Sequence, residues 1–119
     1  MSYSEKIQEV IDGSDVALFM KGTPAFVMCG NSDRALKALR RAGASVTAVD
    51  VLPDPQIRQD LTDISGWPTI PQVFVKGELV GGADIVEELE QSGELEATLK
   101  SKLGDGYAAD RDETTVALT

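Results

Sequence analysis

Cys29 is the residue of this sequence whose side chain can serve both as a nucleophile and as a ligand for a soft metal. It lies between an apolar run of strand length and the polar residues Gly30, Asn31 and Ser32, which open a helical pattern. The N-terminus of a helix presents unpaired N–H groups and a partial positive charge, which favour a thiolate over a thiol. Lys21, at the other end of the same loop, adds a positive charge. This arrangement predicts a reactive thiolate. The alternative is an inert buried thiol, against which the polar residues after Cys29 argue.

The chain holds one cysteine and no histidine, which excludes several kinds of chemistry. It cannot form an intramolecular disulfide, a Cys–His nucleophile pair, or a zinc or haem site with histidine ligands. One thiolate cannot complete a four-thiolate metal site, so the remaining ligands must come from other molecules. A lone cysteine suits a reducing compartment. Because the sequence has no signal-peptide layout and no apolar stretch near ~20 residues, we expect a cytoplasmic protein without a membrane segment.

The 119 residues include 20 acidic and 11 basic side chains, a net charge of −9. An acidic surface repels nucleic-acid phosphates and anionic lipids, so we expect neither nucleic acid nor a membrane as a partner. The same charge balance is typical of halophilic proteins, in which salt screens self-repulsion; an ordinary acidic cytosolic protein is the alternative. Arg34, Lys37 and Arg41 form a basic stripe at helical spacing. The stripe is either a solvated helix face or a surface that attracts anionic thiols.

Helices and strands predicted from the hydrophobic pattern must position these residues. Ser2 and Glu5 match a capping box, Asp54 before Pro55 marks another helix start, and Asp84 is expected as a further N-cap. The expected elements, in chain order, are helix 2–13, strand 16–20, helix 30–43, strand 46–51, helix 54–66, hairpin strands 73–75 and 79–80, and helices 84–93 and 95–103.

This order of elements predicts an α/β fold. Strands 16–20 and 46–51 are joined by a crossover helix and must be parallel, whereas the strands of the hairpin are antiparallel. The result is a small mixed four-stranded sheet with helices on both faces. Residues 1–103 form this domain, and the polar, aperiodic residues 104–119 are expected to be a flexible acidic C-terminal tail.

Three motifs together resemble the monothiol glutaredoxin family of the CGFS type. They are KGTP at 21–24 with CGNS at 29–32, WPTIPQVF at 67–74, and GELVGGADI at 77–85. The resemblance covers roughly residues 4–99 and implies a thioredoxin fold. The sequence departs from the family pattern at two positions: Asn31 replaces the usual phenylalanine after Cys29-Gly30, and Ala83 stands where a second cysteine is common.

The resemblance implies that Cys29 is the catalytic nucleophile and an iron ligand. It further implies that Lys21, assisted by Arg58, pairs with the glycine carboxylate of glutathione. The alternatives are a solvated loop lysine at position 21 and an arginine on an exposed helix face at position 58.

The other implied roles belong to residues that hold the rest of glutathione. Ile70 offers its backbone to the cysteine part, and the peptide bond to Pro71 is cis. Ala83 and Asp84 hold the γ-glutamyl end, with Asp84 facing its ammonium group. The alternatives are a trans proline and an aspartate that only caps its helix. The smaller, polar Asn31 removes apolar cover beside the thiolate and supplies a hydrogen-bond donor.

Two functions follow from the resemblance and from the single cysteine. In the first, a [2Fe–2S] cluster takes one Cys29 from each chain of a homodimer and two thiols from glutathione or a related γ-glutamyl thiol. The cluster is then transferred to apo iron–sulfur client proteins in their maturation and in redox homeostasis. In the second, Cys29 reduces mixed disulfides between proteins and low-molecular-weight thiols by a monothiol mechanism. A redox-inert adaptor is a third, less favoured interpretation.

Overall fold

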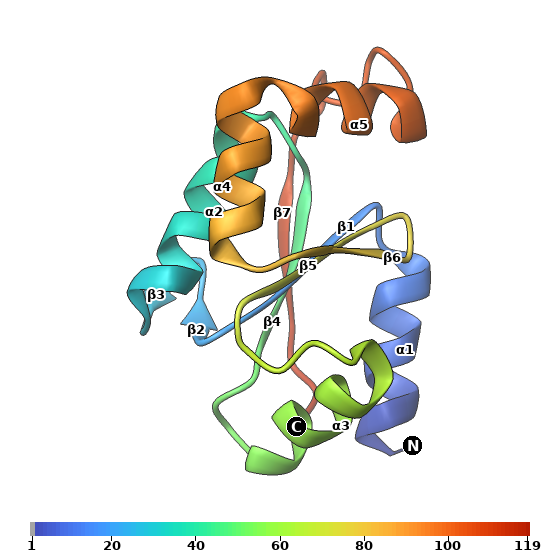
Figure 1. Ribbon diagram of the computed structural model, residues 1–119. Helices are drawn as coiled ribbons and strands as arrows, with labels where there is room; N and C mark the ends of the chain where they lie inside the picture. The colour runs from blue at the N-terminus through green and yellow to red at the C-terminus, as the bar shows by residue number, and fades with distance from the viewer. Residues whose placement is uncertain (1) are drawn as a thin grey trace.

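A five-stranded mixed sheet forms the centre of the computed structural model, which describes residues 2–119. The strands lie in the order β6-β5-β1-β4-β7 (Figure 1). β4 runs parallel to β1 and to β7, whereas β5 runs antiparallel to β1 and to β6. The strand bounds are β1 Val16–Met20, β4 Val46–Asp50, β5 Gln72–Val75, β6 Glu78–Gly81 and β7 Glu113–Val116.

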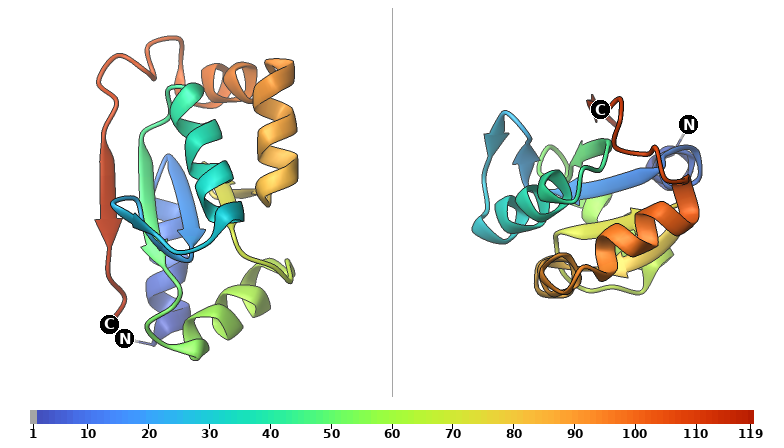
Figure 2. Two further views of the ribbon diagram at one scale, coloured as in Figure 1. Left: turned by 90° about the vertical axis from the view of Figure 1, so that its left-hand side faces the viewer. Right: turned by 90° about the horizontal axis from the view of Figure 1, so that it is seen from above.

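Helices cover both faces of this sheet. α1 packs with α3 on one face and α2 packs with α4 on the other, with α5 following α4 at the end of the sheet (Figures 1 and 2). The helix bounds are α1 Tyr3–Gly13, α2 Gly30–Arg41, α3 Pro55–Ser65, α4 Ala83–Ser92 and α5 Glu94–Leu103. This is the thioredoxin fold, and the predicted mixed sheet between two helical layers is confirmed. No helix in residues 2–119 is long and apolar enough to cross a membrane.

Local signals explain where two of the helices begin and end. The Ser2 side chain and the Glu5 side chain form the predicted capping box at the start of α1. The Asp54 side chain accepts from the N–H of Gln56 at 2.9 Å, and Pro55 occupies the first position of α3. α3 ends at Gly66, whose φ of 71° is a left-handed conformation that glycine adopts readily.

The sheet separates two hydrophobic clusters, because successive side chains of a strand point to opposite faces. Leu18 of β1 belongs to the cluster under α2 and α4, while Phe19 belongs to the cluster under α1 and α3. Phe19 meets Phe74 of β5 edge-to-face, with ring centroids 5.7 Å apart. The two clusters fix the end of β1, from which the loop to Cys29 departs.

The sheet has five strands where the sequence predicts four. The additional strand, β7, comes from residues 104–119, which we expected to be a flexible tail. Here β7 extends the sheet beside β4 (Figure 2), Leu118 is only 4% exposed, and the Tyr107 hydroxyl donates to the Ala42 carbonyl at 2.5 Å. The apolar signal of this edge strand is short: Val116 and Leu118 alternate with an exposed alanine, and the residues before them are polar.

A second small sheet lies in the loop that precedes Cys29 and was not predicted. β2 (Gly22–Thr23) pairs antiparallel with β3 (Phe26–Val27) to form a tight hairpin. Gly22 has a φ of 93°, and a Cβ there would lie 2.3 Å from the Phe26 carbonyl oxygen. Only glycine fits this position, so it sets the path of the chain between Lys21 and Cys29.

Candidate active site around Cys29

Cys29 lies directly before α2, as the sequence predicts, and follows the β2–β3 hairpin, which was not predicted. It is the N-cap residue of α2, with extended backbone angles, and its side chain is half-buried. The neighbouring side chains of Phe26 and Met28 are 76% and 62% exposed. The thiol therefore lies at the surface, beside two exposed apolar side chains and at the positive end of a helix.

The surroundings of Cys29 lower the pKa of its thiol below the ordinary value. The backbone N–H of Ser32 is the largest cause, and the N–H of Asn31, the Ser32 hydroxyl and the charge of Lys21 act in the same direction. Partial burial opposes them. These groups stabilise the charged form of the side chain, which is the form that attacks disulfides and binds metals.

Ser32 connects the thiol to the loop that carries Lys21. Its side chain is buried, and its Oγ accepts from the backbone N–H of Lys21 at 3.1 Å. The Lys21 carbonyl in turn accepts from the N–H of Met28 at 3.0 Å, and the N–H of Gly22 donates to Asp50 at 2.9 Å. The hairpin is thus tied to α2 and to β4, which holds the backbone of Lys21 close to Cys29.

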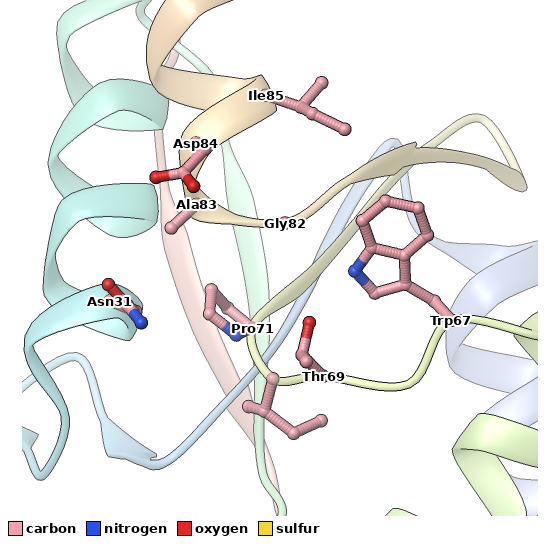
Figure 3. Close-up of a pocket in the computed structure, with 9 residues that line it drawn as sticks. Asn31, Trp67, Thr69, Pro71, Gly82, Ala83, Asp84 and Ile85 are labelled. Atoms are coloured by element: carbon pink, nitrogen blue, oxygen red, sulfur yellow. The ribbon is translucent and has the colours of Figure 1, made fainter.

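A hollow of about 340 Å³ opens beside the start of α2 (Figure 3). One wall is the loop before β5, the other is the first turn of α4, and Asn31 of α2 lies at the side between them. The residues that line it are Asn31, Trp67, Thr69, Ile70, Pro71, Gly82, Ala83, Asp84 and Ile85. The polar side chains that line this hollow include the carboxylate of Asp84 and the neutral amide of Asn31.

The loop wall of the hollow is held by Gln72. Its Nε2 donates to the carbonyls of Trp67 at 2.9 Å and of Thr69 at 3.2 Å. The peptide bond between Ile70 and Pro71 is cis, as the resemblance implies. Within residues 2–119, the buried Nε1 of Trp67 has no hydrogen-bond partner.

The helix wall corrects one prediction from the sequence. Gly82, not Asp84, is the N-cap of α4, and Asp84 lies in the first turn. Because glycine has no side chain, Gly82 makes no side-chain hydrogen bond to the first turn of the helix. A Cβ at this position would lie 3.3 Å from the Pro71 carbonyl oxygen and from Trp67 Nε1. The first N–H groups of α4, including those of Ala83 and Asp84, therefore remain available to a ligand.

Three residues with implied roles, Cys29, Lys21 and Arg58, do not line the hollow. Lys21 lies next to Cys29, on whose thiolate its charge acts, and Arg58 is exposed on α3. Eight of the eleven basic residues form an ion pair within 4.0 Å; among residues 2–119, Lys21 and Arg58 form none. Both cations are thus free of carboxylate partners in the described chain.

The basic stripe on α2 does not present a net positive surface. Arg34 pairs with Asp84 and Glu87 of α4, and Arg41 pairs with Glu90 of α4. Lys37 pairs with Asp33 one turn earlier on α2. The stripe therefore joins two helices, which favours neither an attracting surface for anionic thiols nor a bare solvated face.

Sequence reasoning missed the roles of Ser32 and Arg34. Ser32 belongs to the motif after Cys29, and its burial in a polar stretch could have been inferred from its place on the apolar side of α2. Arg34 contacts residues about 50 positions away in the sequence, and no local pattern predicts such a pairing.

Comparison with known proteins identifies the family of this fold and site. The family model named Glutaredoxin matches residues 16–80, more than half of the chain. The chain belongs to the glutaredoxin family. It is 51% identical over 83 residues to the probable monothiol glutaredoxin GrlA of Legionella pneumophila, covering 70% of this chain and 93% of that protein. This relative identifies the monothiol branch.

Two further comparisons show how far the likeness of this glutaredoxin extends. It is 49% identical over 98 residues to monothiol glutaredoxin-S11 of Oryza sativa, covering 82% of this chain but 20% of that protein. The chain thus spans about a fifth of the length of this plant relative. A crystal structure of a buckwheat glutaredoxin–glutathione complex matches 83% of this chain and 88% of that chain, with a TM-score of 0.72 and 25% identity.

Proposed function

We propose that this monothiol glutaredoxin binds a [2Fe–2S] cluster as cargo, together with glutathione or a related γ-glutamyl thiol, and delivers it to apo iron–sulfur proteins. The observation that carries the proposal is the lowered pKa of Cys29 beside a hollow with both a carboxylate and free N–H groups. A thiolate is the form that ligates iron. The activity belongs in the cytoplasm, where a lone cysteine stays reduced.

The residues around the hollow fit the parts of glutathione. The ammonium group of the γ-glutamyl end binds the Asp84 carboxylate, and its α-carboxylate binds the N–H groups at the start of α4. The backbone of Ile70 pairs with the cysteine part of the ligand. Lys21 and Arg58, which lack carboxylate partners in residues 2–119, bind the glycine carboxylate. The glutathione complex of the buckwheat relative supports this choice of ligand.

A dimer follows from the number of thiolates. A [2Fe–2S] cluster takes four thiolate ligands, and each chain supplies one. Two chains and two glutathione molecules complete the set. The exposed Phe26 and Met28 beside Cys29 supply apolar cover for a cluster held between two copies.

Anaerobic reconstitution with ferrous iron, sulfide and glutathione tests the cluster proposal. We expect visible charge-transfer absorption that co-elutes with a dimer in size-exclusion chromatography. The absorption should be lost in Cys29→Ser and when glutathione is omitted. A colourless monomer from the wild-type chain under these conditions would contradict the proposal.

Reduction of glutathione mixed disulfides is the second candidate, favoured by the polar Asn31 beside the thiolate. The Cys29 thiolate attacks the glutathionyl sulfur of the substrate, whose protein thiol leaves, and a Cys29–glutathione disulfide forms. A second glutathione thiolate attacks that disulfide, which yields oxidised glutathione and regenerates Cys29. We expect steady-state reduction of a glutathionylated test protein by the wild type and none by Cys29→Ser. An adaptor that uses no redox chemistry would keep its partner binding in Cys29→Ser.

A further inference from the structure

A hydrogen-bond network connects Asn31 on α2 to the first two turns of α4. Arg34 Nη1 donates to Asn31 Oδ1 at 3.1 Å, and Arg34 Nη2 donates to Asp84 Oδ1 at 2.9 Å. Arg34 also donates two hydrogen bonds to Glu87, from Nε to Oε2 at 3.2 Å and from Nη2 to Oε1 at 2.8 Å. The guanidinium group thus touches two residues that line the hollow, Asn31 and Asp84.

The pair with Glu87 fixes the position of the guanidinium group. A two-pronged arginine–carboxylate pair is geometrically specific and stronger than a single contact. The Glu87 side chain is 28% exposed, and the hydrogen bonds from Arg34 lower its pKa. Both groups therefore stay charged, and Arg34 holds one orientation toward Asn31.

The charge of Arg34 dictates which way the Asn31 amide faces. A guanidinium group can only donate hydrogen bonds, so the amide must turn its oxygen toward Arg34. Its Nδ2 group then lies on the other side. Figure 3 shows this nitrogen on the side of Pro71, at the hollow. No acceptor in residues 2–119 takes a hydrogen bond from it.

Asp84 presents the complementary group, a hydrogen-bond acceptor. Its side chain is 91% exposed, and Arg34 donates to Oδ1, while no group in residues 2–119 donates to Oδ2. The hollow therefore presents an amide donor at Asn31 and a carboxylate acceptor at Asp84, from two facing helices (Figure 3). A ligand that carries a carboxylate and an ammonium group on one carbon matches this donor and acceptor.

We propose that Asn31 is a specificity residue for the γ-glutamyl end of the thiol and that Arg34 is the residue that positions it. This inference rests on the proposed exchange of Cys29 with a γ-glutamyl thiol. Asn31 Nδ2 donates to the α-carboxylate of the ligand while Asp84 accepts from its ammonium group. The phenylalanine usual at this position in the family has no such donor, so this chain discriminates more strongly against thiols that lack a γ-glutamyl group.

The test compares two disulfides that react with the same cysteine. The protein is equilibrated with glutathione and its disulfide, and separately with cysteinylglycine and its disulfide. Intact-mass spectrometry then gives the two equilibrium constants for the mixed disulfide at Cys29. Both ligands share the Cys-Gly unit, so their ratio reports the γ-glutamyl end and cancels changes in the thiol itself.

Four variants of α2 separate the role of Asn31 from other effects. Asn31→Ala removes the donor, and we expect the preference for glutathione to fall about tenfold. Asn31→Asp keeps an acceptor for Arg34 but replaces the donor with a negative charge, so the preference falls further. Arg34→Gln, which no longer forces the amide to face one way, should lose part of the preference. Lys37→Gln removes the same charge from α2 without touching the network and should keep it.

Each outcome bears on a different part of the argument. An unchanged glutathione preference in Asn31→Ala would overturn the role of Asn31. A loss of preference in Lys37→Gln as large as that in Arg34→Gln would show that the effect of Arg34 is one of net charge. A wild-type chain that forms no mixed disulfide with either thiol would instead contradict the proposed exchange at Cys29. Matching thermal unfolding of the variants and the wild type would confirm that the measured ratios come from folded protein.

Discussion

Ser32 illustrates how one residue next to the nucleophile performs two tasks. Its hydroxyl and backbone N–H stabilise the Cys29 thiolate, and the same hydroxyl accepts from the backbone N–H of Lys21. The sequence identified Cys29, Lys21 and the helix that starts directly after Cys29, because the reactivity of a thiol at a helix N-terminus is a local effect. It did not show Arg34 as a link to Asp84, because that contact depends on how α2 packs against α4.

The lowered pKa of Cys29 predicts its reactivity at neutral pH. Because the thiolate is stabilised in the folded protein, the rate of alkylation by iodoacetamide should reach half its maximum below about pH 8.5, the ordinary value for a cysteine. The rate falls as pH drops through the lowered pKa. In Ser32→Ala the midpoint should move up, but stay below that of the urea-unfolded chain, because the backbone N–H groups remain. A folded midpoint at or above the unfolded one would contradict this assignment.

At the scale of elements, the sequence predicted most helices and strands from their boundaries. Capping residues, prolines and glycines indicated where α1 and α3 begin and end, and the continuous apolar run at 16–20 predicted β1. The hairpin β2–β3 was missed because strands of two residues carry no periodic pattern. The start of α4 was placed at Asp84 because aspartate is a common N-cap, whereas the N-cap is Gly82, where a Cβ would lie only 3.3 Å from the Pro71 carbonyl oxygen.

The β2–β3 hairpin should be sensitive to substitution at Gly22. Gly22→Ala places a Cβ 2.3 Å from the Phe26 carbonyl oxygen at a φ of 93°, so we expect the free energy of unfolding to fall by about 1–3 kcal/mol. Gly13→Ala is the matched control, because nothing lies within 4 Å of a Cβ at this last residue of α1. That control should be neutral or stabilising. Urea denaturation measures both, and equal effects would contradict the strain at Gly22.

At the scale of the whole molecule, the C-terminal residues complete the sheet. β7 covers the edge of β4, and Arg40 of α2 forms a two-pronged pair with Glu113 at 2.7 and 2.8 Å. The sequence could not assign this segment, because its pairing with β4 spans more than 60 residues and its buried apolar side chains are few. The net charge was evident from composition, but its distribution into ion pairs between helices was not.

Leu118 tests whether the C-terminal segment is part of the fold. It is buried in the cluster under α1 and α3, and its carbonyl accepts from Lys6 Nζ at 2.9 Å. Leu118→Ala should lower the free energy of unfolding by about 2 kcal/mol. The exposed Thr119→Ala should change it by less than about 0.5 kcal/mol. A Leu118→Ala chain as stable as the wild type would support the flexible tail instead.

The net charge of −9 predicts that salt stabilises the fold. Salt screens both the repulsion among the 20 acidic side chains and the attraction in exposed ion pairs, and we expect the loss of repulsion to have the larger effect because exposed pairs contribute little. We expect the melting temperature to rise by about 4 °C or more between 10 mM and 1 M potassium chloride, which corresponds to roughly 1 kcal/mol of stability. Over this range the Debye length falls from roughly 30 Å to roughly 3 Å. A melting temperature that falls with salt would show that the ion pairs dominate.

Native mass spectrometry of the anaerobically reconstituted protein is the most direct test of the central claim, that Cys29 of two chains and two γ-glutamyl thiols hold one cluster. The predicted species has the mass of two chains, one [2Fe–2S] cluster and two glutathione molecules, and Cys29→Ser remains a bare chain. Iron bound to a single chain, or a cluster-bridged dimer that contains no glutathione, would contradict the claim.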